Sequence, residues 1–372
     1  MPDKYRILLI TTGGTIAGKV AVPKDKQDSA VIRGADEFHQ LLSSTLNYLA
    51  AADKEEIQIE SYALCAEDSS NILPTHWTGL AKLIKERYDN YEAFLITHGT
   101  NTLGYTCAAL SFALPNPSKP IILTGSQVPA GLPGSDALTN LENALRVAAW
   151  RREKNPIRGV MAVFGSHIIT GTRVKKNTEF DYDAFESFSS GSIGRIGRII
   201  NINESNLERH LKYLHSGTYP EARYGEDLRC EADFDMQIAS FTEFPGMSSK
   251  FFQTLVEKND VKGFILRAFG AGDPCAAHRE TFEYLKNKEI PVVVTTQAPN
   301  GNANMQVNEP GLVLRKARLA IPTYDMSIEA MTTKLAWLLA KRKAGELSYN
   351  SLCDEMVHDL RGEINVLWEV GR

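Results

Sequence analysis

Short apolar runs that end in glycine and small polar residues recur along the first half of the chain. Residues 6–10, 93–96 and 121–123 form such runs, and each is followed by a loop rich in threonine, serine and glycine. Continuous apolar runs of this length are typical of strands that are buried on both faces of a parallel sheet. The pattern therefore predicts parallel strands, each of which delivers a polar loop at its carboxyl end.

Between these runs, apolar residues recur at spacings of three and four, which places them on one face of a helix. The two clearest sets are Trp77, Leu80, Ile84 and Tyr88, and Leu138, Leu141, Leu145 and Ala148. Alternating strands and helices predict an α/β sheet that is covered on both sides. A further strand is predicted at 160–164, and the polar stretch 168–178 is predicted to form a hairpin.

The periodic pattern fades in the middle of the chain. From about residue 213 to 235 the sequence is rich in glycine, proline and acidic residues, which is typical of a connection between domains. The α/β alternation then resumes with apolar runs at 263–266 and 291–294 and a helical pattern at 328–341. We therefore predict an α/β protein with a larger amino-terminal domain of mostly parallel sheet flanked by helices (1–213), a linker (214–236) and a smaller carboxyl-terminal α/β domain (237–372).

Composition and charge exclude several classes of protein. The 372 residues suffice for two to three domains at about 150 residues each. The 41 Lys and Arg residues are balanced by 45 Asp and Glu, so the basic surplus of a nucleic-acid-binding protein is missing. No apolar stretch reaches the ~18 to 20 residues of a membrane span, and the first ten residues lead into a strand without a signal-peptide pattern. We expect a soluble, cytoplasmic protein with no nucleic acid and no membrane as partner.

Cysteine and histidine spacing gives no reason to expect a metal or another cofactor. The five cysteines contain no CxxC pair, and the eight histidines contain no HExxH motif. Cys107 and Cys275 are both isolated in the sequence, and we expect them to be buried thiols.

Two of the predicted loops are unusually rich in hydroxyl groups and glycine. They span residues 11–18 and 97–102, and they follow strands whose carboxyl ends form the usual ligand-binding edge of an open α/β sheet. Either loop taken alone is more typical of a tight strand-to-helix turn, whereas two such loops in one domain favour a functional site. A phosphate cradle is disfavoured, because the GxxxxGK[ST] and GxGxxG spacings are absent. A threonine nucleophile needs a neighbouring base, for which Lys175 and Lys176 are candidates, although adjacent lysines also suit a solvated turn.

These loops carry a resemblance to a known family. The chain resembles the bacterial-type L-asparaginases over nearly its whole length, and the segments at 68–71, 183–185 and 360–363 are similar to the cytoplasmic type I branch. The matching motifs are TGGTIAG at 12–18, HGTNT at 98–102, LTGSQ at 123–127, Ser135-Asp136 with Asn140-Leu141, and TTQ at 295–297.

The resemblance implies hydrolysis of L-asparagine to L-aspartate and ammonia through a threonine nucleophile and an acyl-enzyme, without a metal or a cofactor. It places the nucleophile at Thr15, the second catalytic threonine at Thr100 and the lysine that works with it at Lys176. Ser69 and Ser70 match the positions that hold the α-carboxylate and α-amino groups of the substrate. L-Glutamine is a further possible substrate, since one methylene is worth only about 1 to 3 kcal/mol.

Backbone N–H groups supply the remaining substrate contacts that we expect. Gly14, Gly99 and Ser126 stand in the matching loops, where their N–H groups suit a substrate or an oxyanion. The family resemblance also implies a homodimer or homotetramer in which the smaller domain helps to complete a neighbouring site, with Asp273 and residues 302–306 as the segments to watch.

One position departs from the family motif HGTDT, because residue 101 is Asn instead of Asp. Loss of the carboxylate leaves more of Lys176 as the free amine, but it also removes attraction for the substrate ammonium and the orientation of the lysine. Because positioning and preorganised charge usually dominate a catalytic step, we expect a weakened catalyst. Glu179, Asp181 and Asp183 follow the lysine and are alternative partners, although such residues usually face solvent.

Two other functions stay open at this point. The segment 19–34, which matches the family lid, contains no tyrosine. How the site closes over a substrate is therefore left open. Asn101 is the feature that suits a catalytically silent homologue that binds asparagine or aspartate as a sensor or structural partner. A component of a tRNA-dependent amidotransferase would share the amidase core, and we expect such a component to carry a further amino-terminal domain.

Overall fold

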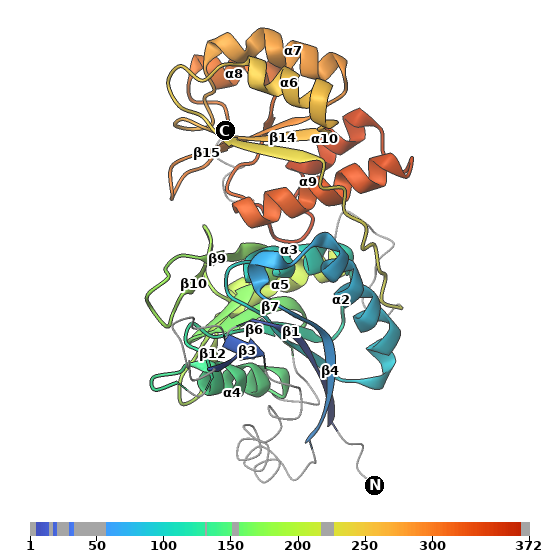
Figure 1. The fold of residues 1–372 in the computed structure, drawn as a ribbon, viewed down its shortest axis with the longest axis vertical. Helices are drawn as coiled ribbons and strands as arrows, with labels where there is room; N and C mark the ends of the chain where they lie inside the picture. Colours follow the sequence, from blue (N-terminus) through green and yellow to red (C-terminus); the bar gives the residue numbers. More distant parts are fainter. Residues whose placement is uncertain are drawn as a thin grey trace. The chain divides into compact units, whose positions relative to one another are not determined.

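The computed structural model describes residues 5–14, 18–20, 30–32, 57–130, 132–150, 156–216 and 227–365 (Figure 1). The chain divides into two compact units, Met1–Ala232 and Asp233–Arg372. The division between them falls inside the segment 214–236. Each unit is built on a sheet of its own.

The first unit is built on an eight-stranded sheet. Its strands are β1 (Tyr5–Gly13), β4 (Ile57–Glu67), β5 (Ala93–Thr97), β6 (Pro120–Thr124), β7 (Gly159–Phe164), β8 (His167–Thr170), β11 (Gly194–Ile196) and β12 (Ile200–Ile202). They lie in the order β12-β11-β8-β7-β6-β5-β1-β4. The five strands from β4 to β7 are parallel, and β8, β11 and β12 continue the sheet with antiparallel pairings. The mostly parallel sheet predicted from the apolar runs is therefore confirmed.

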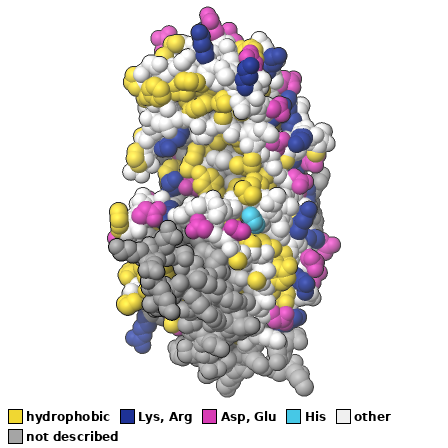
Figure 2. All heavy atoms as spheres, viewed as in Figure 1, with side chains coloured by type: hydrophobic (Ala, Val, Ile, Leu, Met, Phe, Trp, Pro, Cys, Tyr) yellow, Lys and Arg dark blue, Asp and Glu magenta, His cyan; other side chains and the backbone are white. Residues whose placement is uncertain are grey.

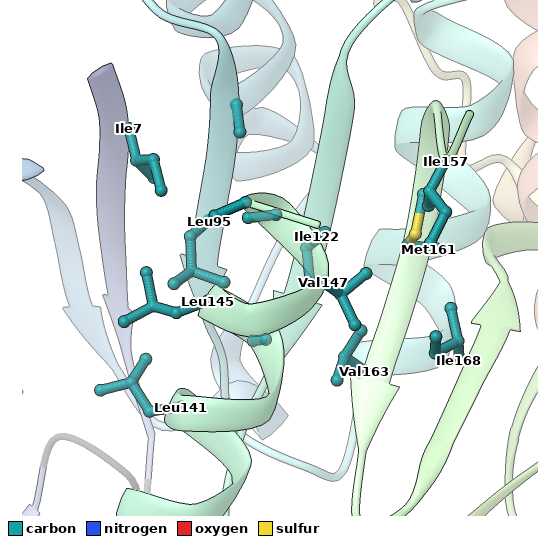
Figure 3. Close-up of a cluster of buried hydrophobic side chains, with 14 of the residues drawn as sticks. Ile7, Leu95, Ile122, Leu141, Leu145, Val147, Ile157, Met161, Val163 and Ile168 are labelled. Atoms are coloured by element: carbon teal, nitrogen blue, oxygen red, sulfur yellow. The ribbon is translucent and has the colours of Figure 1, made fainter. Parts of the chain in front are cut away.

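Helices cover both faces of this sheet, as predicted (Figure 1). They are α2 (Pro74–Arg87), α3 (Leu103–Ala113), α4 (Ala137–Ala148) and α5 (Glu204–Ser216). The apolar face of α4 packs on one side of the sheet, where Leu141 and Leu145 point toward side chains of β1, β5 and β6 (Figure 3). On β1, Ile7 and Leu9 face this cluster, while the alternating residues are buried on the other side. Burial on both faces explains why these strands are apolar throughout.

The helix α3 was not predicted. Ten of its eleven residues are buried, among them Cys107, so apolar and small residues occupy every side of the helix. A helix that is apolar all round has no periodic polar face, and periodicity cannot reveal it. Cys107 is a buried thiol, as expected, and burial raises its pKa well above the usual value.

The predicted hairpin at 168–178 is wrong in its pairing. This stretch forms β8, a 3₁₀ turn, η5 (Gly171–Arg173), and β9 (Val174–Lys176), and the two strands do not pair with each other. β8 pairs with β7, whereas β9 forms a two-stranded hairpin with β10 (Phe185–Ser187). A Cβ at Gly171 would lie 2.4 Å from Ser111 Oγ, so the chain passes tightly against α3 before it enters β9. The turn therefore redirects the chain, and β9 leaves the main sheet.

Two further short strands are described in this unit. They are β2 (Gly18–Val20) and β3 (Ala30–Ile32), which pair antiparallel.

The second unit contains a parallel four-stranded sheet in the order β13-β14-β15-β16 with helices around it. Its elements are β13 (Ile238–Thr242), α6 (Lys250–Asn259), β14 (Gly263–Ala268), α7 (Arg279–Asn287), β15 (Val292–Thr296), α8 (Glu309–Lys316), β16 (Ile321–Pro322), α9 (Ile328–Lys343) and α10 (Tyr349–Val357). The smaller α/β domain and the helix at 328–341 are thus confirmed.

A buried ion pair ties the end of the described chain to α9. Lys334 Nζ lies 2.6 Å from Glu363 Oε1, and both side chains are fully buried. Burial alone would raise the pKa of Glu363, but the charge and hydrogen bond of Lys334 hold it below its usual value. Removal of one partner would leave a buried charge unpaired, which is strongly destabilising.

The expectation for Cys275 is wrong, because this thiol is exposed. Cys275 stands at the start of a surface 3₁₀ turn, η6 (Ala276–His278), and its backbone N–H donates to Glu243 Oε1 at 2.8 Å. The backbone of this residue is therefore anchored while its side chain reaches solvent.

The surface carries charges of both signs. On the face drawn in Figure 2, the described Lys and Arg side chains are interspersed with Asp and Glu over both units. Among the described residues, no helix is both long and apolar enough to cross a membrane.

Candidate active site

The parallel strands β1, β5 and β6 bring three glycine-containing loops to one edge of the sheet. A Cβ at Gly14, whose φ is +79°, would lie only 2.4 Å from Gly99 N, so the loops after β1 and β5 touch backbone to backbone. A Cβ at Gly125 would lie 2.4 Å from His98 O, which brings the loop after β6 equally close. Glycine is required at these positions because any side chain would force the loops apart.

A fourth segment joins this edge from the end of β4. A Cβ at Gly99 would meet Ser69 Oγ at 2.6 Å. Ser69 starts a 3₁₀ turn, η2 (Ser69–Asn71), in which Asp68 accepts a hydrogen bond from Ser70 N at 2.8 Å. Thr102 Oγ1 donates to Ser69 O at 2.6 Å and fastens the turn to the loop after β5. Ser69 is buried and Ser70 is exposed, so of these two adjacent hydroxyls only that of Ser70 is open to solvent.

Thr100 and Lys176, which are 76 positions apart, meet at this edge. Lys176 Nζ donates to Thr100 Oγ1 at 2.9 Å. The lysine stands at the end of β9, opposite Phe185 of β10, and its side chain is only 13% exposed. A threonine hydroxyl within hydrogen-bond reach of an amine is the arrangement that proton transfer requires. Lys175, the other candidate base, lies opposite Glu186 in the same hairpin.

The amide of Asn101 bridges the lysine and the turn at Ser70. Its Oδ1 accepts from Lys176 Nζ at 3.3 Å, and its Nδ2 donates to Ser70 Oγ at 3.1 Å. This assignment of the amide follows from its partners, since a lysine ammonium can only donate. Because the amide donates to Ser70, the Ser70 hydroxyl proton is left for another acceptor. A carboxylate at this position would take that proton instead.

Lys176 has a third partner, which the sequence suggested only as one of several alternatives. Glu179 Oε2 lies 2.8 Å from Lys176 Nζ, although the Glu179 side chain is 67% exposed. The other two acidic residues of the loop are engaged elsewhere or exposed: the Asp183 carboxylate accepts from Ser166 N at 2.9 Å, and Asp181 is exposed.

His98 is a buried member of the site, and its role was not predicted from the sequence. Its Nδ1 lies 2.7 Å from Gly99 O and its Nε2 lies 2.9 Å from Thr106 Oγ1, which accepts from Trp77 Nε1. A carbonyl only accepts, so Nδ1 carries the proton and Nε2 accepts from Thr106. Burial lowers the pKa of His98 to about 4, so the ring is neutral near pH 7. The chain of bonds fixes the β5 loop against α2 and α3.

A second polar network orders the loop after β6. The Asp136 carboxylate accepts from Gln127 N at 3.0 Å and Val128 N at 2.9 Å, and Asn140 Nδ2 donates to Gly125 O at 2.9 Å. Ser126 is fully buried, and its Oγ has no hydrogen-bond partner among the residues that the structure describes. The loop is therefore held by α4 and not by its own serine.

Some predicted positions are not among the described residues, and one belongs to the second unit. Thr15 and most of the lid segment 19–34 lie outside the described residues. In the second unit, the Asp273 carboxylate accepts from Asn308 Nδ2 at 2.6 Å and from Gly311 N at 3.3 Å. Within the described ranges, no group of His, Cys, Asp and Glu has the arrangement to hold a metal ion.

A threonine hydroxyl beside a lysine amine, at the carboxyl edge of a doubly covered α/β sheet, suits an enzyme that uses nucleophilic and acid–base chemistry. Two family profiles match the chain: "Asparaginase, N-terminal" over residues 6–208 and "Glutaminase/Asparaginase C-terminal domain" over residues 237–347. The chain therefore belongs to the asparaginase family.

Individual relatives agree with this assignment. The chain is 32% identical to an L-asparaginase of Thermococcus kodakarensis, over 90% of this chain and 92% of the relative. It is 34% identical to L-asparaginase 1 of Escherichia coli K12, over 80% and 82% of the two chains. It is also 30% identical to a component of the glutamyl-tRNA(Gln) amidotransferase of Methanococcus maripaludis, over 98% of this chain and 82% of that one.

Solved structures of the family share the fold. The thermostable L-asparaginase from Thermococcus kodakarensis aligns with a TM-score of 0.78 at 30% identity, covering 97% of this chain and 99% of that chain. L-asparaginase I from Vibrio cholerae aligns with a TM-score of 0.77 at 29% identity, covering 98% and 100%.

The close approach of the loops yields a first prediction. Gly99→Ala would place a Cβ 2.6 Å from Ser69 Oγ and 3.3 Å from Gly14 Cα, so we expect the edge to separate. The expected cost is about 1 to 3 kcal/mol in the free energy of unfolding, as for overpacking, together with loss of ligand binding at the edge. Urea unfolding and calorimetry with L-aspartate measure the two effects.

The matched control is Gly79→Ala in α2, where a Cβ would meet nothing closer than Leu64 Cδ1 at 3.8 Å. This change should leave ligand binding intact and raise stability by about 0.5 to 1 kcal/mol. Equal stability of the two alanine variants would contradict the assigned contact between the loops.

The buried neutral His98 predicts a pH dependence of stability. Its pKa is about 4 in the folded chain against about 6.5 when unfolded, so the unfolded chain binds more protons between these values. Stability is fully present above about pH 6.5 and falls as the pH drops toward 4, by about 3 kcal/mol for this group. Urea unfolding between pH 7.5 and 4 should be flatter for His98→Gln than for the native chain. Identical slopes would refute the assignment.

Proposed function

We propose that the protein hydrolyses the side-chain amide of L-asparagine to L-aspartate and ammonia through a covalent acyl-enzyme. The observation that carries the proposal is the 2.9 Å contact between Thr100 Oγ1, in the loop that carries the HGTNT motif, and Lys176 Nζ at the end of β9. The match of both family profiles supports the same chemistry.

In the proposed mechanism, Thr15 Oγ1 attacks the amide carbon while its proton passes to Lys176, directly or by way of Thr100. The lysine then returns the proton to the leaving nitrogen, which departs as ammonia when the C–N bond breaks. Water attacks the resulting ester in the second half of the reaction, which releases aspartate and restores the threonine hydroxyl. No metal or cofactor enters the proposed steps.

Ser69 and Ser70 are proposed to hold the α-carboxylate and α-amino groups of the substrate. Backbone N–H groups of Gly14, Gly99 and Ser126 are proposed to contact the substrate and its developing oxyanion. The free hydroxyl proton of Ser70 supports a contact with the anionic end of the substrate, because Asn101 already donates to the Ser70 oxygen. L-Glutamine remains a candidate second substrate.

We also propose that the protein acts in the cytoplasm as a homodimer or homotetramer. Resemblance to the type I branch supports the compartment, and the 34% identity to L-asparaginase 1 of Escherichia coli supports that branch. The domains of the proposal are 1–213 and 237–372, joined by the linker 214–236.

A catalytically silent homologue that binds asparagine or aspartate is the second candidate. The amide at Asn101 favours it, because Asn101 contacts Lys176 at 3.3 Å without supplying a negative charge. Binding without turnover would leave Thr100 and Lys176 without a use, which favours the enzyme.

The test is ammonia release from L-asparagine by the native chain and by variants of adjacent lysines. Lys176→Met should lower kcat about 10²- to 10⁴-fold, as expected for loss of an acid-base group. Lys175→Met is the matched control and should retain the native rate, since Lys175 lies opposite Glu186 in the hairpin. Thr15→Ala should abolish turnover. Binding of L-aspartate without any turnover, even by Asn101→Asp, would establish the silent homologue.

The role of position 101 is tested by Asn101→Asp. Restoring a carboxylate beside Lys176 should raise kcat/KM by about tenfold or more, because an ion pair replaces a 3.3 Å hydrogen bond to a neutral amide. Steady-state kinetics with both amides measure the gain. An unchanged kcat/KM would mean that the amide at this position does not limit the enzyme.

A further inference from the structure

Lys176 has one ion-pair partner within the described part of the chain, and that partner lies outside the family motif. Its contacts to Thr100 and Asn101 are to neutral oxygens, whereas Glu179 Oε2 lies 2.8 Å away and carries a negative charge. The Lys176–Glu179 pair thus has the same net charge as a lysine paired with an aspartate at position 101.

An exposed ion pair is usually worth little, because solvent screens it and the side chains move. Two observations set this pair apart. The Lys176 side chain is only 13% exposed. Glu179 stands on a loop that hydrogen bonds anchor on both sides of this residue. Solvent therefore screens the charge on Lys176 Nζ, the atom that takes part in the proposed reaction, less than it would screen an exposed lysine.

The loop that carries Glu179 is held by four contacts to its own ends and to neighbouring segments. Asn177 N donates to Ala184 O at 2.8 Å, and Tyr182 Oη donates to Gly134 O at 2.6 Å. Gln127 Nε2 donates to Asp181 O at 3.3 Å, and Asp183 accepts from Ser166 N at 2.9 Å. The contacts of Tyr182 and Asp181 tie the loop to the segment that follows β6, and the other two hold its ends and join it to Ser166, so the chain is anchored on both sides of Glu179.

We propose that Glu179 is a positioning residue that replaces the missing carboxylate of position 101 and holds Lys176 toward Thr100. The proposal rests on the proposed amide hydrolysis. The negative charge that balances Lys176 then comes from Glu179, three residues further along the chain. Asn101 contributes only a hydrogen bond from its uncharged amide oxygen to the lysine and a hydrogen bond to Ser70. The impairment expected from Asn101 is then partial.

The experiment measures kcat and KM for ammonia release by Glu179→Gln in two backgrounds. With Asn101 present, we expect kcat to fall about 10- to 100-fold, as for a misplaced catalytic group, with KM changed less than about threefold. In the Asn101→Asp background, Glu179→Gln should lower kcat by less than about threefold, because residue 101 then supplies the carboxylate. If Glu179 were only structural, Glu179→Gln would lower kcat by the same factor in both backgrounds.

Two further variants separate positioning from general effects. Glu186→Gln removes an exposed carboxylate from the same hairpin, opposite Lys175, and should leave kcat unchanged. Tyr182→Phe removes the bond to Gly134 O and should lower kcat in the same direction as Glu179→Gln, without adding to it in the double variant. Thermal unfolding should be the same for Glu179→Gln and Glu186→Gln.

The outcomes distinguish the two proposals. An active native chain whose Glu179→Gln variant keeps its kcat would overturn the role of Glu179 and leave amide hydrolysis standing. A native chain without turnover that Asn101→Asp activates would also overturn it, since Glu179 then fails to replace the aspartate. If Asn101→Asp is inactive as well, the proposed hydrolysis itself fails.

Discussion

The site depends on the close approach of two backbones at the edge of the sheet. A methyl group on Gly14 would lie 2.4 Å from Gly99 N, and one on Gly99 would lie 2.6 Å from Ser69 Oγ and 3.3 Å from Gly14 Cα. This approach lets the loops after β1 and β5 present their polar groups to one small volume, with Ser69 directly behind them. The neighbouring elements hold that geometry: the buried strands fix the loop bases, and His98 and Asp136 fasten the loops to the helices.

The sequence predicted the parts of the fold that rest on periodicity. The apolar runs and the amphipathic α4 follow from burial on one or both faces, which leaves a direct mark in the sequence. The helix α3 leaves no such mark because it is buried all round. The hairpin predicted at 168–178 was wrong because the constraint at Gly171, which redirects the chain out of β8, comes from α3. Such tertiary contacts are invisible to local patterns.

The residues of the site also divide into those that the sequence predicted and those that it did not. Thr100, Lys176 and the turn at Ser69 were found through motifs, and the structure brings these groups to one edge. His98 was overlooked although it belongs to a motif, because a histidine in a loop has no pattern that reveals a buried, neutral ring. The particular partner of Lys176 also depends on how the loop after β9 folds, which spacing alone leaves undecided among Glu179, Asp181 and Asp183.

The hairpin that carries Lys176 is separate from the main sheet, and its acidic partner is only three residues away in sequence. The lysine's contact with Asn101, by comparison, joins residues 75 positions apart. A contact between residues that are close in sequence forms as soon as the hairpin forms. Because the loop that it closes is very short, little chain entropy is lost in making it. Such an ion pair is also free to change by single substitutions in one short segment. On the proposed role of Glu179, the local pair supplies the negative charge, so the distant position 101 is free to carry an amide.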